Sequence, residues 1–339
     1  MNKDYRIWRN FPAILLLQNG VSVSLFHNKA STSSSLKPWF VTGFCDAESS
    51  FRITIQKNNK FTVGYQVGAF FQISVHTKDR VLLELIQSFF GVGNIYKEHK
   101  DSIQYRVNTL KGLNVIVNHF NKYPLITQKW ANFELFKQVV DLMNRKEHLT
   151  KEGLQQIINI RASINLGLSD KLKTDFPNTK PVNIPAVEFK GIPDSNWLAG
   201  FTSGEGCFRV DISNFSSNKW GVNLRLTITQ HSRDEQLLKS FIKYFSFDER
   251  LSESGRKSKY IYKYRDRDAV KFDVTRYSDI EKIILFFDKY PIIGEKSKDF
   301  EDFKKVALLM QSKIHLTQEG FEEICKIKLG MNRGREVEV

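Results

Sequence analysis

Two similar segments of this chain each place a single carboxylate between an apolar run and a run of alternating polarity. The segment WLAGFTSGEGCF, residues 197–208, contains Glu205, and the looser copy WFVTGFCDAESSF, residues 39–51, contains Glu48. Taken alone, each residue is typical of an ordinary carboxylate at a helix end. Because the same acid recurs at the same place in both segments, we expect Glu48 and Glu205 to share a chemical role.

Small residues recur along each apolar run. Gly43 and Ala47 are four positions apart, as are Gly200 and Gly204. Each run therefore predicts a helix with a stripe of small residues along one face. Two such helices can approach closely, which would bring their carboxyl ends together. The opposite faces carry large apolar side chains, which we expect to anchor each helix in its own domain: Trp39, Phe40, Phe44, Trp197, Leu198 and Phe201.

Two carboxylates at neighbouring helix ends would repel each other, and the negative ends of the helix dipoles would add to the cost. Divalent cations remove both problems. Mg²⁺ prefers oxygen ligands, and paired cations can stabilise the attacking and leaving oxygens of a phosphodiester during in-line displacement. The glutamate pair therefore predicts metal-dependent phosphodiester hydrolysis. His76 and His231 also recur, but no Cys or second His lies at metal-ligand spacing from them, so a histidine-type nuclease site is not indicated.

The whole chain is an internal repeat. The segment HFNKYPLITQKWANFELFK from His119 is echoed by FFDKYPIIGEKSKDFEDFK from Phe286, and QISVHTKD from Gln72 by TITQHSRD from Thr227. A proline-rich stretch without helical or strand periodicity separates the two copies and predicts a linker. The expected organisation is a leader at 1–36, targeting or unstructured, a first domain at 37–168, the linker at 169–193, a second domain at 194–333 and a tail at 334–339.

Alternating apolar and polar residues predict strands after each glutamate. Within each copy the expected order is a helix, a long hairpin, a helix, a second hairpin and further helices, which is an α+β fold. The outward strand faces are rich in Arg, Gln, Asn, Ser and Thr, which hydrogen-bond base edges in a major groove. An ordinary solvated sheet face is the alternative. We expect the following side chains to bind DNA: Ser50, Arg52, Thr54, Gln56, Gln72, Ser74, Gln104, Arg106, Cys207, Arg209, Asp211, Ser213, Asn223, Arg225, Thr227, Thr229, Lys257, Lys259, Lys271 and Asp273.

The composition agrees with a nucleic-acid partner. The chain of 339 residues has 51 Lys and Arg against 37 Asp and Glu, a formal net charge of +14, and such an excess favours a polyanion. No apolar run approaches the roughly 18 residues of a membrane span. The three cysteines match no disulfide or zinc spacing.

The two glutamate segments resemble the signature of the LAGLIDADG homing endonucleases. WLAGFTSGEG matches the signature almost letter for letter, VTGFCDAES is a looser match, and each is followed by a strand and later by a KYP segment. The resemblance covers residues 37–333 and is to the single-chain, two-repeat group encoded in organellar introns. It implies two pseudo-symmetric αββαββα domains whose antiparallel sheets form a DNA-binding saddle. It also implies cleavage of both strands at a long asymmetric target, which leaves 3′ overhangs.

The resemblance assigns metal ligands to four positions. Glu48 and Glu205 occupy the place of the family's metal-binding acids, and the backbone oxygens of Ala47 and Gly204 are expected to assist them. The implied cofactor is Mg²⁺, and Mn²⁺ or Ca²⁺ could occupy the same site.

Further catalytic residues follow from the same resemblance. Lys129, Lys296 and Gln230 are expected to order water or to stabilise developing charge. The first repeat departs from the pattern in two places, with Val75 where the second has Gln230 and Ser49 where the signature has its last glycine. The valine predicts an active site that is not fully symmetric, whereas the serine is expected only to alter how tightly the helix passes into the strand.

The implied partner is double-stranded DNA, bound by a monomer that has no membrane partner, and the implied location is the mitochondrion. Two alternatives stay open at this point. One is an intron-splicing maturase that binds intron RNA, with or without cleavage activity. The other is a DNA-binding repressor that does not cleave, although such a protein would usually have lost at least one of the two acids.

Overall fold

The computed structural model describes residues 35–216, 219–247 and 260–335. The expected leader lies outside these residues except for positions 35 and 36, and of the expected tail only residues 334 and 335 are described. Lys257 and Lys259, predicted to bind DNA, also lie outside them.

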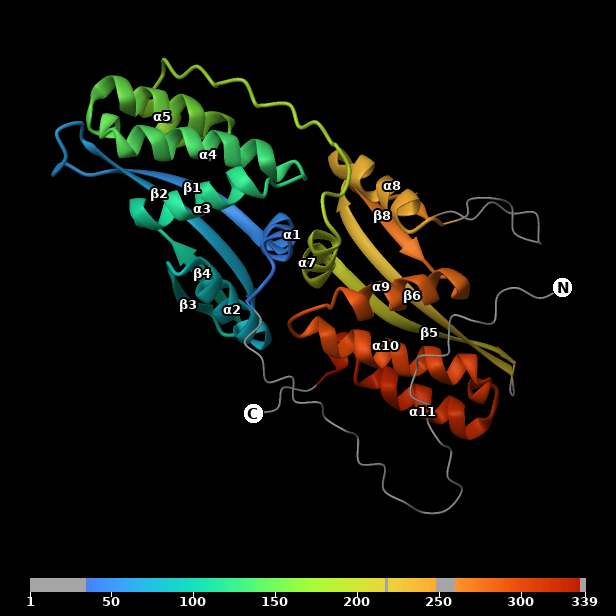
Figure 1. Ribbon diagram of the computed structural model, residues 1–339. Helices are drawn as coiled ribbons and strands as arrows, with labels where there is room; N and C mark the ends of the chain where they lie inside the picture. The colour runs from blue at the N-terminus through green and yellow to red at the C-terminus, as the bar shows by residue number, and fades with distance from the viewer. Residues whose placement is uncertain (1–34, 217–218, 248–259, 336–339) are drawn as a thin grey trace. The chain divides into compact units, whose positions relative to one another are not determined.

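Both repeats have the predicted order of elements (Figure 1). The first consists of α1 (Pro38–Glu48), β1 (Ser49–Lys57), β2 (Tyr65–His76), α2 (Arg80–Phe90), β3 (Asn94–His99), β4 (Ser102–Val107), α3 (Leu110–Lys122), α4 (Lys129–Asn144) and α5 (Lys151–Ser163). The second consists of α7 (Ser195–Glu205), β5 (Gly206–Ser216), β6 (Lys219–His231), α8 (Glu235–Tyr244), β7 (Ile261–Lys263), β8 (Ala269–Val274), α9 (Tyr277–Lys289), α10 (Lys296–Gln311) and α11 (Gln318–Leu329).

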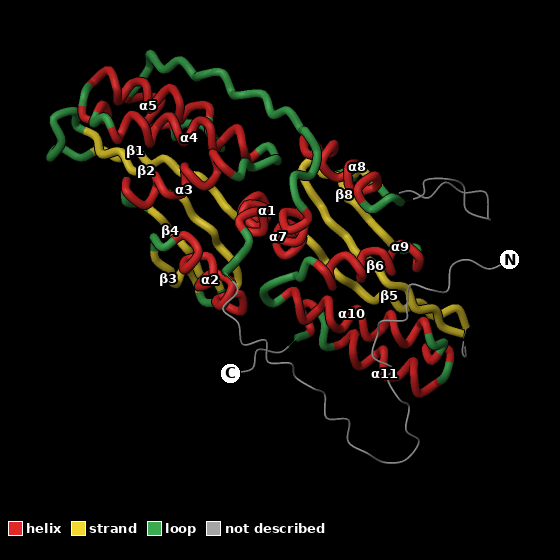
Figure 2. Tube along the Cα trace, in the orientation of Figure 1, coloured by secondary structure: helices red, strands yellow, loops and turns green. Residues whose placement is uncertain are grey.

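Each repeat builds one four-stranded antiparallel sheet, which confirms the α+β prediction. The strand orders are β1-β2-β4-β3 and β5-β6-β8-β7, so the two sheets have the same topology. Helices α3 and α4 pack on the first sheet, and α9 and α10 pack on the second (Figure 2). The helices of each repeat therefore bury one face of its sheet.

The buried sheet faces carry the apolar residues that alternation predicted. In β1, Phe51 is 1 % exposed, and its ring centroid lies between 5.2 and 5.9 Å from those of Phe71, Phe120, Phe133 and Phe136. The matching phenylalanine of β5 sits in a similar aromatic cluster. Burial of large aromatic side chains supplies much of the stability of such cores.

The two repeats meet through α1 and α7, which lie side by side as the small-residue stripes predicted (Figure 1). A methyl group on Gly43 would collide with the backbone carbonyl of Trp197, and one on Gly200 would collide with that of Phe40. At Gly204 an added methyl would overlap the methyl group of Ala47 in α1. Glycine is therefore required at these positions because the two backbones are in direct contact.

One contact of this helix pair was not predicted. Trp197 is buried in the core, as expected, but its indole Nε1 also donates a hydrogen bond to Asp46 Oδ2 of α1 at 2.8 Å. The ring is fully buried and stacks on Phe201 at 4.8 Å. A buried indole N–H needs an acceptor, and the buried carboxylate of Asp46 supplies it from the opposite helix.

The linker contains a short helix that the sequence did not predict, α6 (Asp170–Asp175). Ser169 caps it by accepting a hydrogen bond from Leu172 N. Asp175 accepts a hydrogen bond from Tyr65 Oη of β2 at 2.8 Å, so the linker is attached to the first sheet. Six residues are too few for helical periodicity to be visible in the sequence.

The close approach of α1 and α7 predicts that Gly43→Ala and Gly200→Ala are strongly destabilising. Each added methyl would meet backbone that cannot move without separating the helices, a cost of about 1–3 kcal/mol or more. Denaturant unfolding monitored by circular dichroism measures the loss. Gly330→Ala is the control, because its added methyl would lie in ordinary contact, 3.5 Å from Ile327 O. If the two helix variants were as stable as the control, the backbone contact would not limit the structure.

Candidate active site at the helix pair

Glu48 and Glu205 are the last residues of α1 and α7, so the helix pair brings both to one place. A methyl group on Gly204 would lie 3.2 Å from Glu48 Oε1, which places the Glu48 carboxylate against the end of α7. The glutamates are half-buried and each feels the charge of both Lys129 and Lys296. The structure thus joins the four charged residues that the sequence predicted for the site.

Burial sets the electrostatics of the two acids. It raises the pKa of Glu48, and the positive charges of Lys296 and Lys129 offset only part of that shift. Burial likewise raises the pKa of Glu205, partly offset by a hydrogen bond from Gln230. The ionised carboxylates therefore lack complete compensation within the protein, and an additional cation would stabilise them.

The two lysines begin α4 and α10 and point at the ends of the signature helices. Lys129 Nζ donates to the backbone carbonyls of Cys45 and Ala47, at 3.0 Å each, and Lys296 Nζ donates to the carbonyl of Gly204. Burial lowers the pKa of both ammonium groups, against the opposing effect of the nearby acids. Both carbonyls that the resemblance assigned to a metal are thus occupied by lysine ammonium groups in this structure.

The two halves differ where the sequence predicted. Gln230 in β6 hydrogen-bonds the Glu205 carboxylate, whereas Val75 at the matching place in β2 lines the cavity beside Glu48 without a polar group. Ser49, in place of the signature's last glycine, donates its hydroxyl to Cys45 O at 2.7 Å. Only one of the two acids therefore has an amide partner from its own sheet.

Asp46 is a site residue that sequence reasoning missed. Its carboxylate is 4 % exposed and accepts hydrogen bonds from Ile126 N, from the backbone N–H and hydroxyl of Thr127, and from Trp197 Nε1. It thereby ties α1 both to the loop that leads into Lys129 and to α7. The second repeat has a serine here, so the internal repeat gave no signal for it.

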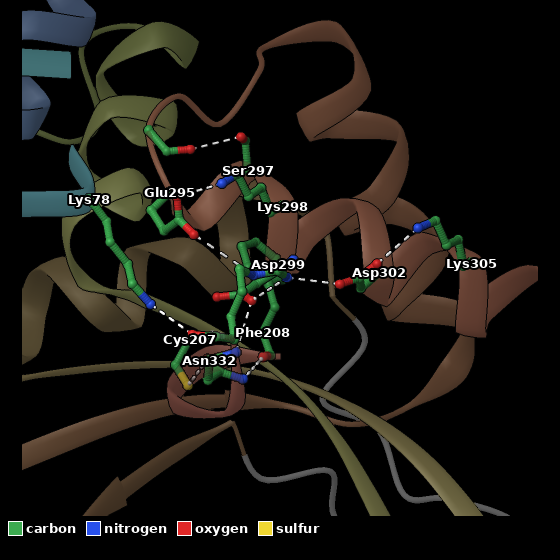
Figure 3. Close-up of polar contacts among 12 residues, drawn as sticks. Lys78, Cys207, Phe208, Glu295, Ser297, Lys298, Asp299, Asp302, Lys305 and Asn332 are labelled. Atoms are coloured by element: carbon green, nitrogen blue, oxygen red, sulfur yellow. Dashed lines mark hydrogen bonds and ion pairs between the residues drawn. The ribbon is translucent and has the colours of Figure 1, made fainter. Parts of the chain in front are cut away.

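A cavity of about 760 Å³ lies beside Glu48, and Asn332 is among the residues that line it. Asn332 donates through Nδ2 to a backbone carbonyl of β5, and its own N–H donates to Asp299 at 2.9 Å (Figure 3). Lys78 of the first repeat donates to a carbonyl of the same C-terminal segment. The segment therefore joins the second repeat to the first at the edge of the site.

Most of the side chains predicted to bind DNA are exposed or half-buried on their sheets, but three are buried: Gln72, Gln104 and Asp273. Their strand positions agree with the prediction, because each is paired across the sheet with another residue of the outward face. Gln72 is opposite Arg106, Gln104 is opposite Ser74, and Asp273 is opposite Thr227. The neighbours cover them. Gln104 Nε2 donates to Ser74 Oγ at 2.9 Å, and Gln104 Oε1 accepts from Arg106 Nε. Gln104 and Asp273 hydrogen-bond neighbouring side chains instead of facing solvent.

The arginines predicted to read bases have different environments in the two repeats. Arg225 pairs with Asp211 and Asp273, and Thr227 also donates to Asp273 at 2.7 Å. Arg52 is exposed and makes no ion pair with any residue that the structure describes. A guanidinium held by two carboxylates is fixed in orientation, whereas that of Arg52 is available to a ligand.

The donor set fits a hard divalent cation. In the described part of the chain, no cluster of three or more His, Cys, Asp or Glu side chains could hold a metal. Two glutamates with neighbouring carbonyls would leave several positions to water and to a phosphate, which is the usual environment of Mg²⁺ in phosphoryl-transfer sites. The ammonium groups on Ala47 O and Gly204 O show that positive charge is already favoured there.

The profile of the LAGLIDADG endonuclease family matches residues 41–140 and 198–307. The chain is 40% identical over 332 residues to probable intron-encoded endonuclease 2 of Neurospora crassa, covering 92% of this chain and 70% of that one. A second N. crassa protein, probable intron-encoded endonuclease 3, is also 40% identical, and the match spans 57% of its length. A shorter match, 48% identical over 120 residues, is to a protein in ND4 intron 1 of Podospora anserina.

Solved structures give the same result. The I-SmaMI LAGLIDADG homing endonuclease bound to cleaved DNA is 43% identical with a TM-score of 0.84, over 89% of this chain and 98% of that one. The LAGLIDADG meganuclease I-CpaMI bound to uncleaved DNA is 45% identical with a TM-score of 0.82, over 88% of this chain and 100% of that one. I-SmaMI has also been solved on an uncleaved target in the presence of calcium ions.

Within the residues described here, no helix is both long and apolar enough to cross a membrane.

The raised pKa values of the acids predict a stability effect that is independent of cleavage. Burial raises the folded-state pKa of both glutamates, so the ionised form is less favourable in the folded protein than in the unfolded chain. This destabilisation is present above the folded-state pKa and is relieved as the pH falls. Without divalent cations, Glu48→Gln and Glu205→Gln should therefore unfold at the wild-type temperature or slightly above it.

Adding Ca²⁺ should reverse the order, because bound cation stabilises only the folded state and the variants lack a ligand. Thermal unfolding of the wild type and both variants, in EDTA and in Ca²⁺, measures this. A variant markedly less stable than wild type in EDTA, or an equal response to Ca²⁺ in all three proteins, would contradict the assignment.

Proposed function

This chain belongs to the LAGLIDADG family of homing endonucleases, and from that premise we propose that Glu48 and Glu205 form one composite site that cuts both strands of a DNA duplex with Mg²⁺. The observation that carries the proposal is the meeting of the two acids at the ends of the closely packed α1 and α7. Family members depend on divalent metals, and a calcium-containing structure is among the similar ones.

Each polar group of the site has a role in this proposal. When bound, a divalent cation neutralises phosphate charge and supplies Lewis-acid activation. Glu48 and Glu205 would hold it, assisted by the carbonyls of Ala47 and Gly204. Lys129 and Lys296 lie beside the same atoms, so each ammonium group can turn toward a phosphate and stabilise developing negative charge.

Gln230 orients Glu205 and the water around it, and the first repeat lacks this group. The scissile phosphates of the two strands therefore meet different surroundings. Unlike side chains on the two sheets suit a long, asymmetric target, and we propose staggered cuts that leave 3′ overhangs.

We further propose that the protein acts as a monomer, since both acids of the site come from one chain. Relatives named after ND4 and cox1 introns favour a mitochondrial location. The similar proteins are named as endonucleases, which favours DNA cleavage over the splicing-maturase alternative.

The test uses a target recovered by wild-type cleavage of a randomised duplex library. Glu48→Gln and Glu205→Gln should each slow double-strand cleavage at least about a hundred-fold, while the Kd for DNA in Ca²⁺ changes little, because the acids hold metal and not bases. Glu84→Gln, an exposed exchange on α2, is the control. Normal double-strand cleavage by either active-site variant would refute the proposal.

The sheet faces generate a second prediction. Arg52→Ala should relax the preference at one or two base pairs, since a bidentate contact to a base is worth about 1–3 kcal/mol of discrimination. Lys151→Ala, an exposed change at the start of α5, should leave the profile unchanged. Cleavage profiling on single-base variants of the target compares them. An Arg52→Ala profile identical to wild type would show that β1 does not read bases.

A further inference from the structure

Two aspartates occupy equivalent places in the repeats, each at the end of the short 3-10 turn that follows the second strand of its sheet. Asp79 is the N-cap residue of α2 and Asp234 the N-cap residue of α8, where an aspartate usually accepts a hydrogen bond from the first turn of its own helix. In the described structure neither side chain does so. Their carboxylates are therefore free of the usual capping role in their own helices.

Both carboxylates accept a backbone hydrogen bond from the opposite repeat. Asp79 Oδ1, in the first repeat, accepts from Glu295 N in the second at 2.7 Å. Asp234 Oδ1, in the second repeat, accepts from Gln128 N in the first at 2.9 Å. The two contacts are reciprocal across the boundary between the repeats.

The two donor residues lie directly before the lysines of the site. Gln128 and Glu295 are the N-cap residues of α4 and α10, and the next residues along the chain are Lys129 and Lys296. A negative charge at the start of a helix also interacts favourably with the helix dipole. Each aspartate therefore fixes the starting point of the helix that carries the other repeat's active-site lysine.

The fit on the Asp79 side is close. Gly294, with φ +94, precedes Glu295, and a methyl group there would lie 2.5 Å from Asp79 Oδ1. Burial raises the pKa of Asp79 and of Asp234, and the backbone hydrogen bond is the first of the effects that lower it again. Because the carboxylates are partly desolvated, losing the N–H partner would be costly, so the contact holds both groups in place.

We propose that Asp79 and Asp234 are reciprocal positioning residues, each of which sets the lysine of the opposite repeat against the active site. The inference rests on the proposed function, since it assumes that Lys129 and Lys296 act in cleavage. It makes each repeat dependent on the other for the placement of its own lysine.

A double-mutant cycle tests the pairing, with single-turnover cleavage of the recovered target as the readout. Asp79→Ala should slow cleavage about tenfold or more in the wild-type and Lys129→Met backgrounds, but should add little in the Lys296→Met background. Asp234→Ala should show the opposite dependence. If the aspartate contact only holds the two repeats together, Asp79→Ala will slow cleavage by the same factor in both lysine backgrounds. That outcome would overturn the inference.

Two further variants keep the result interpretable. Asp79→Asn and Asp234→Asn retain an acceptor oxygen and should restore most of the rate, and DNA affinity in Ca²⁺ should stay near wild type throughout. If Asn fails to restore the rate while folding and affinity are normal, the inference is wrong. Failure of the proposed function is distinguishable, because Glu48→Gln and Glu205→Gln would then cleave at the wild-type rate. If only the assumed role of the lysines is wrong, Lys129→Met and Lys296→Met will cleave at that rate instead.

Discussion

The backbone contact between α1 and α7 is the constraint on which the rest of the structure depends. Glycines at 43 and 200 let each helix rest against a carbonyl of the other, which is closer than any side chain would permit. Because the helices end together, their terminal glutamates must share one environment. A looser pairing would give two separate carboxylates, each hydrated and each with an ordinary pKa.

The charges of the site follow from that contact. Two acids and two lysines are brought into a half-buried space, where burial raises the pKa values of the acids and lowers those of the lysines. The lysine ammonium groups donate to helix-end carbonyls that a divalent cation can also use. The site is thereby kept in a state that favours additional positive charge and that lowers the stability of the fold, as is common for functional sites.

Much of this arrangement could be predicted from the sequence. The repeated glutamates, the small-residue stripes and the alternation of the strands depend on local spacing, and all three predictions agree with the structure. The placement of Lys129 and Lys296 came only from family resemblance, because their distance from the glutamates along the chain gives no physical signal.

The features that the sequence did not reveal depend on contacts between distant segments. Asp273 alternates outward, as predicted, yet it is buried because Arg225 and Thr227 from the neighbouring strand close over it. Trp197 of the second repeat donates a hydrogen bond to Asp46 of the first. Asp79 accepts no hydrogen bond from its own helix and instead accepts one from the backbone of the loop before α10 in the opposite repeat. Sequence periodicity does not predict such pairings, since each residue taken alone is compatible with an ordinary core position or an ordinary helix cap.

Anomalous scattering from Mn²⁺ in crystals of this protein with its DNA target tests the central claim most directly. We predict Mn²⁺ at the ends of α1 and α7, in contact with carboxylate oxygens of both Glu48 and Glu205, with the Lys129 and Lys296 ammonium groups moved off the carbonyls that the metal takes. Mn²⁺ bound elsewhere, or at one glutamate without the other, would contradict a single site shared by the two repeats.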